Sequence, residues 1–513
     1  MHSRVYSATI IGVDAHLVEV EVDLSLGMLQ FFIVGLPDRA ITESRQRIQT
    51  AIKNSGIRLP ERKITVNLAP ADLKKEGTMF DLPILVGILQ AAQQIKVTAD
   101  FLEETLFFGE LSLDGAIRPI KGALSLAYDG IKMGKKRLIV PQENAAEAAL
   151  VENIEVIGVC HVVQLMQYLR HELALIPTKT QRGSRAIQFS DRLNFSQVRG
   201  QYQAKRALQI AAAGRHNILF LGSPGSGKTM LARRLATIMP PMNFDEMLQT
   251  SKIYSVSGRL GAEGLIQDRP FCSPHHTISQ AGLVGGGSFP QPGQISLAHN
   301  GILFLDELTE FKRATLEVLR QPLESKTVSI ARANQTISFP ASFLLMSALN
   351  PCPCGYLGDS KKACSCSAQY VQSYLQKLSG PLLDRIDLQL HIQSVDYATL
   401  KTKDESPYSS ERLYQAVERA VKCQEQRFGS TSIANATMTS DQVEQYCILV
   451  PEAERLLEAA FDKLKLSMRG YHKILKVART IADVQNSELI QAAHIQEAIM
   501  YRSLDQTLEK LKK

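Results

Sequence analysis

The chain has 513 residues, of which 45% are hydrophobic and 21% charged, so its composition fits a soluble globular protein of about three domains. The net charge of +7 allows a nucleic-acid partner without demonstrating one. No apolar run reaches the roughly 18 residues of a membrane-spanning helix, and the first residues lack a signal-peptide pattern, so we expect a cytoplasmic protein with no membrane partner.

Strand and helix patterns alternate over residues 1–171, which predicts an α/β domain. The alternation of apolar and acidic residues over 17–23 indicates a half-buried strand. Residues 38–54 are typical of a helix, and Asp114-Gly115 between apolar runs predicts a hairpin. Further strands are predicted at 31–34, 63–68, 137–141 and 154–157, and further helices at 81–92, 121–133, 144–151 and up to about residue 170.

The stretches 109–120 and 130–144 resemble the protease domain of Lon, and resemble still more the protease-like domain of the recombination protein RadA. Lon cleaves peptides with a serine nucleophile and a lysine base. The turn that carries the serine matches Gly77–Asp81 here, and the lysine position falls near Leu124. Thr78 is a weak substitute nucleophile because it lacks a matching base. The resemblance therefore implies a Lon-protease-like (ribosomal S5 domain 2-like) fold without peptidase chemistry, serving for binding or oligomerisation.

Residues 172–192 are polar and interrupted by Pro and Gly, so they are predicted to be a linker. The next domain, predicted over 193–395, begins with 194–201 and a helix at 204–213. This start resembles the segment that packs near the adenine in AAA+ modules.

A Gly-rich loop between an apolar run (217–221) and a helical pattern (from 230) has the order of a phosphate-binding P-loop. The loop consists of Gly222, Ser223, Pro224, Gly225, Ser226, Gly227, Lys228 and Thr229. Glycines let backbone N–H groups converge on phosphate oxygens, and the helix N-terminus adds a positive dipole. Lys228 is predicted to contact the β- and γ-phosphates of ATP, and the Thr229 hydroxyl to bind Mg²⁺.

The apolar strand predicted at 301–305 ends in two carboxylates, about 80 residues after the P-loop. This is the Walker B arrangement, in which Asp306 holds the Mg²⁺ shell and Glu307 orients the attacking water. The alternative is an ordinary charged strand end.

Residues 271–288 are rich in Gly, Ser and His and predict a flexible loop. Adjacent residues in a strand point to opposite faces, so His275 and His276 are not expected to share a metal ion. In ring-forming motors that this chain resembles, such an insertion faces the central pore.

Two short strands are predicted around Ala333-Asn334, within 327–340. The next strand, 343–349, ends at Asn350, which resembles the sensor 1 residue that positions the water or contacts the γ-phosphate. An Asn is also common at strand ends and before a proline such as Pro351.

Four of the eight cysteines lie within 15 residues, at Cys352, Cys354, Cys364 and Cys366. Four thiolates suit a structural, tetrahedral Zn²⁺ site, although Cys-x-Cys spacing is tighter than the usual zinc knuckle. A loop of reduced thiols or a redox pair remains an equal alternative.

Two arginines complete the candidate site. Arg385, within 379–388, resembles the arginine finger that AAA+ proteins supply to the ATP of a neighbouring subunit. A salt bridge to Asp384 or Asp387 is the alternative. Arg469 resembles the sensor 2 arginine, against the alternative of a surface salt bridge. Residues 396–513 predict a helical lid, with helices at 409–425, 440–446, 452–466, 471–485 and 487–501.

From about residue 193 the chain resembles the AAA+ modules of the magnesium-chelatase-like group. The whole chain resembles the ComM/YifB family, on the strength of the stretches 271–279, 301–308 and 350–355. This resemblance implies a nucleotide-dependent homo-hexamer that hydrolyses ATP with Mg²⁺ and acts on single-stranded, duplex or branched DNA. The implied role is a helicase or branch-migration translocase in homologous recombination during natural transformation.

Three other functions compete with the DNA motor. A magnesium-insertion motor acting on a porphyrin would need an Asp-x-Ser-x-Ser partner domain, which this sequence lacks but a separate subunit could supply. A protein-remodelling ring would use the Lon-like domain to recruit polypeptides. A non-motor nucleotide switch is disfavoured by Glu307.

Overall fold

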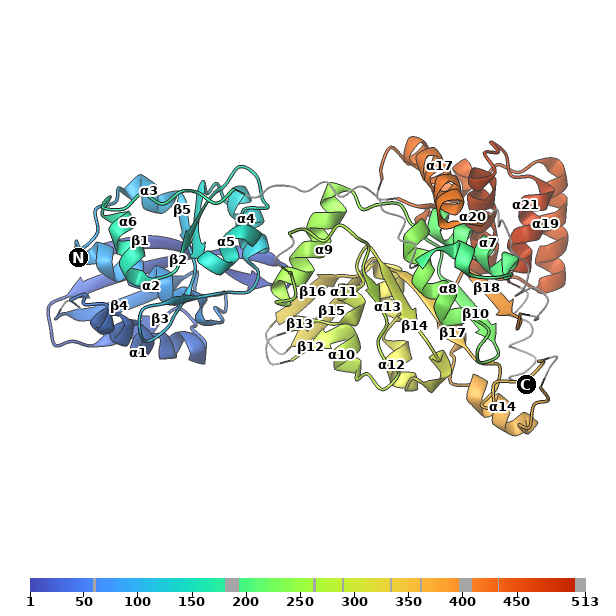
Figure 1. Cartoon of the computed structure of the whole chain (residues 1–513), viewed down its shortest axis with the longest axis horizontal. Coiled ribbons are helices and arrows are strands. Elements are labelled where there is room, and N and C mark those ends of the chain that lie inside the picture. Colours follow the sequence, from blue (N-terminus) through green and yellow to red (C-terminus); the bar gives the residue numbers. More distant parts are fainter. Residues whose placement is uncertain are drawn as a thin grey trace. The chain divides into compact units, whose positions relative to one another are not determined.

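The computed structural model describes residues 1–58, 61–179, 193–261, 264–287, 290–332, 335–359, 362–395, 408–431 and 433–502. The chain forms two compact units (Figure 1). The first contains Met1–Ser184 and Met247–Ile266, and the second contains Arg185–Glu246 and Gln267–Lys513. Most of the predicted linker, residues 180–192, and the predicted hairpin tip at 333–334 lie outside the described residues.

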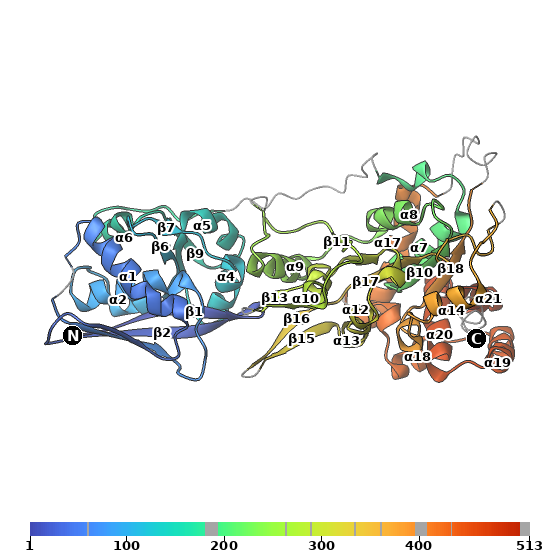
Figure 2. The ribbon, with the colours of Figure 1, turned by 90° about the horizontal axis from the view of Figure 1, so that it is seen from below.

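The first unit is built on a seven-stranded sheet with the order β3-β4-β2-β1-β5-β8-β9. Strands β1 and β2 form a long antiparallel pair (Figure 2), β4 runs antiparallel to β2, and the remaining neighbours are parallel. The strands are β1 (His2–Ile11), β2 (Asp14–Ser25), β3 (Phe31–Val34), β4 (Lys63–Ala69), β5 (Thr105–Phe107), β8 (Arg137–Pro141) and β9 (Glu155–Val159). The predicted hairpin around Asp114-Gly115 is confirmed as the pair β6 (Glu110–Leu111) and β7 (Ile117–Arg118).

Helices cover both faces of this sheet, which explains why the parallel strands are apolar at successive positions. In β8, Leu138 and Val140 pack in one core with α4 and α5, whereas Ile139 packs in another with α1, α2 and α6. The helices of this unit are α1 (Arg39–Asn54), α2 (Asp81–Ala91), α3 (Ala99–Glu103), α4 (Ala123–Lys132), α5 (Gln142–Ala148) and α6 (Val162–Leu169).

The first unit also contains a segment that the sequence places in the ATPase domain. Most of α9 (Phe244–Val256) belongs to residues 247–266, which join this unit. Lys252 Nζ lies 2.9 Å from Asp14 Oδ1 and 3.1 Å from Asp129 Oδ2. The Ser255 hydroxyl donates to Glu147, and the Ser255 carbonyl accepts from the Gly122 N–H at 3.2 Å. These contacts anchor the segment among α4, α5 and the β1–β2 turn.

The second unit has a parallel five-stranded sheet with the order β11-β14-β17-β10-β18. The strands are β10 (Ile218–Gly222), β11 (Phe271–Cys272), β14 (Ile302–Leu305), β17 (Leu344–Leu349) and β18 (Leu388–Ile392). The hairpin predicted within 327–340 is confirmed as β15 (Thr327–Arg332) and β16 (Gln335–Pro340). The α/β fold class expected from the sequence is thus confirmed.

Within 271–288, residues 271–287 are described, and they hold more regular structure than the predicted flexible loop. They contain β11, α10 (Gln280–Val284) and β12 (Gly285–Gly286), which pairs with β13 (Gln291–Pro292). The Ser279 hydroxyl caps α10 by accepting from the Gly282 N–H. Buried Leu283 packs with Ile295 and Leu303, so this segment is part of the core.

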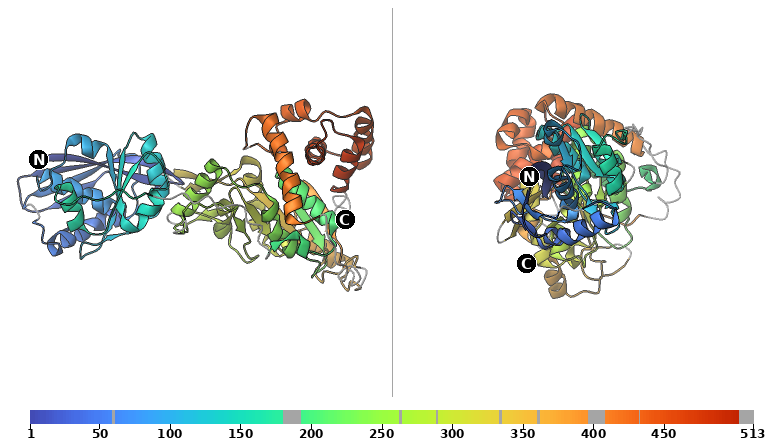
Figure 3. Two further views of the ribbon diagram at one scale, coloured as in Figure 1. Left: turned by 45° about the horizontal axis from the view of Figure 1, so that its top comes forward. Right: turned by 90° about the vertical axis from the view of Figure 1, so that its left-hand side faces the viewer.

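The C-terminal helices gather in one group (Figure 3). They are α17 (Ser410–Phe428), α18 (Ser440–Tyr446), α19 (Pro451–Leu464), α20 (Met468–Val484) and α21 (Ala492–Met500). Their apolar faces share one core with β10 and with α7 (Tyr202–Gly214). Among the helices of the described residues, none combines the length and apolar character needed to cross a membrane.

Candidate nucleotide-binding site

The order of the second sheet brings three predicted motifs to one edge. Strand β17 lies between β14 and β10, so the carboxyl ends of these parallel strands are neighbours. The P-loop follows β10, Asp306 follows β14, and Asn350 follows β17. Ligands of open parallel sheets bind at this edge.

The P-loop joins β10 to α8 (Lys228–Leu235) with a backbone that its glycines make accessible. Gly225 and Gly227 have φ of 79° and 92°, in the region that favours glycine. A Cβ on Gly222 would lie 2.5 Å from the Ile392 carbonyl oxygen. The buried Ser226 hydroxyl has no hydrogen-bond partner among the described residues. The glycines thus shape the loop, and the Ser226 hydroxyl is a buried polar group that lacks a partner within the described residues.

Lys228 lies inside the loop. Its Nζ donates to the carbonyls of Gly222 at 2.7 Å and Ser223 at 3.0 Å, and to Asn350 Oδ1 at 3.1 Å. Burial lowers the pKa of Lys228, opposed by the charges of Asp306 and Glu307. The structure thus joins the predicted phosphate-binding lysine to the predicted sensor 1 asparagine.

Thr229 and Asp306 also meet, although 77 positions separate them. Thr229 Oγ1 donates to Asp306 Oδ2 at 2.6 Å. A hydroxyl and a carboxylate oxygen at this separation are hard donors of the kind that Mg²⁺ prefers beside ATP phosphates. The pair fits the magnesium site predicted from the sequence.

Glu307 follows with a left-handed backbone, φ 51°, and a side chain that is 53% exposed. Its carboxylate lies 3.4 Å from His276 Nδ1, and the His276 ring lies 4.1 Å from that of His275. The expectation that the two histidines point to opposite faces is wrong, because they lie in a turn after β11 and not in a strand. The contact of His276 with Glu307 has no local sequence signal.

Arg385 and Arg469 form a second group, centred on Glu324. Arg385 Nη2 lies 2.5 Å and Arg469 Nη2 3.9 Å from Glu324 Oε1. The hydrogen bond from Arg385 and the charges of both arginines hold the pKa of Glu324 below its usual value. Arg385 also donates to the Pro381 carbonyl at 2.6 Å, while its Nε is buried without a partner among the described residues.

The carboxylate bound by Arg385 is therefore neither Asp384 nor Asp387, the two alternatives expected from the sequence. Asp387 instead contacts Lys473 at 3.1 Å and His216 at 3.3 Å. This ion-paired cluster joins α20 to the start of β18.

The cysteines form one compact cluster beside the P-loop edge. The Sγ atoms of Cys352, Cys354, Cys364 and Cys366 all lie within 4.8 Å of one another. Backbone N–H groups of Tyr356 and Ser365 lower the pKa of Cys354 to about 6. All four are free thiols, as a thiolate metal site requires.

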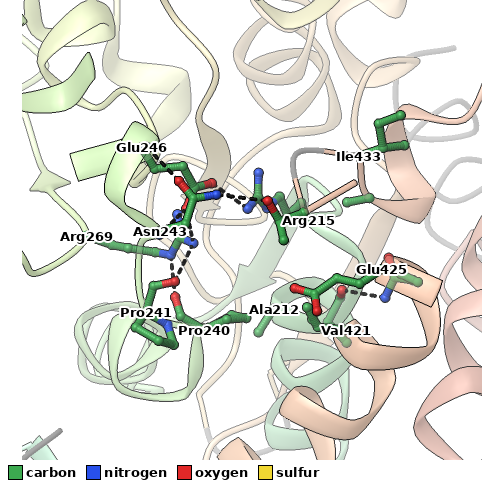
Figure 4. Close-up of a pocket in the computed structure, with 14 residues that line it drawn as sticks. Ala212, Arg215, Pro240, Pro241, Asn243, Glu246, Arg269, Val421, Glu425 and Ile433 are labelled. Atoms are coloured by element: carbon green, nitrogen blue, oxygen red, sulfur yellow. Dashed lines mark hydrogen bonds and ion pairs between the residues drawn. The ribbon is translucent and has the colours of Figure 1, made fainter. Parts of the chain in front are cut away.

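A separate pocket lies between the sheet domain and the C-terminal helices of the second unit (Figure 4). Glu246 Oε1 binds Arg215 at 2.7 Å and its Oε2 binds Arg269 at 2.9 Å. Although burial opposes it, the two guanidinium groups lower the pKa of Glu246. Asn243 donates to Thr431 across the pocket at 2.9 Å. The charges of Glu246, Arg215 and Arg269 are paired with one another, which indicates a structural joint.

Three family models match most of the chain. "Magnesium chelatase, subunit ChlI" matches residues 194–400, "Subunit ChlI of Mg-chelatase" matches 20–144, and "Magnesium chelatase, subunit ChlI C-terminal" matches 407–502. The protein YifB of Escherichia coli (strain K12), described as uncharacterized, is 42% identical over 513 residues, covering 100% of this chain and 99% of YifB.

Competence protein ComM of Haemophilus influenzae is 43% identical over 512 residues, which cover 99% of this chain and 98% of ComM. The chain belongs to the ComM/YifB family of magnesium-chelatase-like AAA+ proteins. The chain also shows a more limited likeness to Lon protease 2 of Bacillus subtilis, at 30% identity over 167 residues, which cover 30% of this chain and 30% of Lon protease 2.

The Lon-like likeness agrees with the α/β fold of the first unit. In that unit Leu124 is fully buried, and the Thr78 hydroxyl donates to Glu110. Leu124, near which the sequence predicts the lysine position of Lon, is thus an aliphatic core residue.

Proposed function

We propose that this protein is a Mg²⁺-dependent ATPase that assembles into a homo-hexameric ring and performs work on DNA. One observation carries the ATPase proposal: Lys228 meets Asn350, and Thr229 meets Asp306, at a single sheet edge next to Glu307. This combination of a cation, a polar sensor, a metal-binding pair and an exposed carboxylate suits phosphoryl transfer to water.

In this proposal Lys228 and the P-loop N–H groups bind the β- and γ-phosphates. Thr229 and Asp306 hold Mg²⁺, which neutralises charge on the phosphate oxygens. Glu307 orients the attacking water once its carboxylate has turned away from His276. Asn350 hydrogen-bonds the γ-phosphate or the water, and its contact with Lys228 positions it to do so.

The arginines are proposed to serve the ATP of a neighbouring copy. Arg385 and Arg469 share Glu324, and neither takes part in the contacts that join the P-loop to Asn350 and Asp306. A planar, permanently charged guanidinium suits transition-state charge on the phosphoryl group. Nucleotide-dependent assembly would then complete each ATP site.

The DNA role is supported by likeness to relatives. The Haemophilus influenzae relative is named a competence protein, and the likeness spans the whole chain. The net charge of +7 is compatible with a polyanionic partner. We propose a cytoplasmic helicase or branch-migration translocase that promotes homologous recombination of transforming DNA.

The test uses a labelled four-way junction, a forked duplex and a single strand, each incubated with the full chain, ATP and Mg²⁺. Conversion of the junction or fork that requires ATP supports the proposal. The Lys228→Ala variant, which should not bind ATP productively, is the control. Failure to convert any substrate contradicts the translocase proposal.

The match to magnesium chelatase models makes magnesium insertion the second candidate. Its discriminating measurement is ATP-dependent insertion of Mg²⁺ into a porphyrin, by absorbance, with the same preparation. Insertion without any effect of DNA would favour this candidate.

A further inference from the structure

We propose that Cys352, Cys354, Cys364 and Cys366 bind one Zn²⁺ and that the metal-bound loop packs against the P-loop. ATP binding depends on this packing. This inference rests on the proposed nucleotide site. It adds a structural metal whose loss should weaken nucleotide binding.

The distances between sulfur atoms fit a shared metal better than disulfides. Cys352 Sγ lies 3.3 Å from Cys354 Sγ and 3.6 Å from Cys364 Sγ, and Cys354 lies 3.5 Å from Cys364. Tetrahedral thiolates around Zn²⁺ lie about 3.8 Å apart, because each Zn–S bond is about 2.3 Å. A disulfide would need about 2.05 Å. These three sulfurs, together with Cys366 Sγ within 4.8 Å of each, lie close enough to share one central ion.

The backbone around the cluster is folded for thiolate ligands. Gly355, with φ 83°, closes a tight turn in which its N–H donates to the Cys352 carbonyl at 2.9 Å. The Cys366 N–H points to Cys364 Sγ at 3.4 Å. Cys352 is fully buried against the core of the sheet, so one ligand is fixed in position. Four sulfur ligands leave no open position, which indicates a structural and not a catalytic ion.

Three contacts connect this loop to the P-loop. Asn350, two residues before the first ligand, accepts from Lys228 at 3.1 Å. The missing side chain of Gly355 makes room for the Pro224 ring, since a Cβ there would lie 2.5 Å from Pro224 Cδ. Asp359, between the ligand pairs, accepts from the Ser223 hydroxyl.

Two of these contacts, at Gly355 and Asp359, lie between the two cysteine pairs, and the third lies at Asn350, just before the first cysteine. A metal that ties Cys352 and Cys354 to Cys364 and Cys366 restricts the segment that carries Gly355 and Asp359. Without it, the segment loses its cross-link, and Pro224 and Ser223 lose their support. The P-loop would then lose more conformational freedom when it binds phosphate, and this entropic cost weakens the affinity for nucleotide.

The experiment measures zinc content by elemental analysis and the Kd of a fluorescent ATP analogue by titration, on the full chain and on variants. We expect about one zinc per chain in the native protein. Cys366→Ser should lower the zinc content and weaken nucleotide binding by about tenfold. Cys366→His, which supplies another zinc ligand, should restore both. Cys160→Ser, at an exposed cysteine of the first unit, is the matched control.

A second variant tests the connection without touching the metal. Asp359→Ala should retain zinc and still bind nucleotide several-fold more weakly. A thermal melt of each variant shows whether the fold survives. Native protein without zinc overturns the metal site, and Cys366→Ser with normal nucleotide affinity overturns the dependence.

Failure of this inference differs from failure of the ATPase proposal. If the native protein binds zinc but no nucleotide, the proposed function is contradicted and the metal site stands. If the native protein binds nucleotide but no zinc, the metal site is contradicted and the proposed nucleotide site stands. Lys228→Ala should lose nucleotide binding and keep its zinc.

Discussion

Glu307 combines an unusual backbone with a weakly held side chain. Its φ of 51° is uncommon for a residue with a side chain, and such conformations often occur at functional sites. Its N–H donates to Asp306 Oδ1 at 3.0 Å, which fixes the turn after β14. The carboxylate itself meets His276 at 3.4 Å and remains 53% exposed. The turn is therefore fixed while the reactive group stays accessible to water.

Glu307→Gln should bind ATP with an affinity within about twofold of the native protein but hydrolyse it at least about 100-fold more slowly. The amide keeps the size of the side chain and cannot polarise water as a carboxylate does. Nucleotide titration and phosphate release measure the two properties. Glu310→Gln, three residues away and exposed, is the control and should hydrolyse ATP normally. Normal turnover in Glu307→Gln would refute the role of this residue.

Two helices carry charged groups that join parts of the chain far apart in sequence. On α20, Lys473 contacts Asp387, which also meets His216. Burial opposes ionisation of Asp387, but the charges of Lys473 and His216 hold its pKa well below the usual range. The ionised form is therefore the one that the folded state favours.

Asp387→Asn should lower the free energy of unfolding by about 3 kcal/mol at pH 7, because Lys473 then lacks its buried partner. A depressed carboxyl pKa contributes stability above the unfolded pKa of about 4 and loses it as the pH falls further. The difference between the native protein and the variant should therefore shrink below about pH 4. Urea unfolding at pH 7 and below about pH 4 measures this difference in the free energy of unfolding. Asp462→Asn, at an exposed position, is the control. A difference that is independent of pH would contradict this.

On α9, Lys252 is 6% exposed and contacts Asp129, which is equally buried. Lys252→Met should destabilise the packing of residues 247–258 by about 2 kcal/mol, because a charge-assisted hydrogen bond to buried Asp129 is lost. Asp129 keeps the more exposed Lys132 and the Ala15 N–H as partners. Hydrogen exchange of this segment should accelerate, and exposed Lys53→Met should leave it unchanged. Unchanged protection in Lys252→Met would show that the ion pairs do not hold α9.

Local patterns predicted most elements but not their long-range partners. The P-loop, β14 and the 327–340 hairpin follow from apolar runs and turn residues. In contrast, α21 begins at Ala492 and not near Ser487, because Ile490 forms a bridge with Leu449. The contact of Glu324 with Arg385 and the position of α9 depend on tertiary packing, which periodicity does not encode.

At the level of the whole molecule, the site residues fall into two groups. The group around Lys228 and Asp306 is complete within one chain, whereas Arg385 and Arg469 meet at Glu324. If the arginines act on a neighbour, one chain supplies the P-loop and the next supplies the finger. The active unit is then the contact between two copies.

Mixing two inactive variants tests whether neighbouring chains share one ATP site. Lys228→Ala and Arg385→Ala should each be nearly inactive alone. In a ring assembled from equal amounts, about a quarter of the contacts combine an intact P-loop with an intact finger, so activity should reappear. The rate of ATP turnover by the mixture measures this recovery. The size of the mixed assembly first verifies that the two variants assemble together. No recovery in mixed rings would show that Arg385 acts within its own chain.

The central claim is that ATP hydrolysis at this site is coupled to DNA. Its most direct test is the rate of ATP turnover by the native protein with and without single-stranded, duplex and branched DNA, using Glu307→Gln as the baseline. We predict that at least one DNA raises the rate of ATP turnover about fivefold or more, because DNA binding should speed the conformational steps of a motor that acts on DNA. An identical rate with every DNA, well above the Glu307→Gln baseline, would show an ATPase that does not act on DNA.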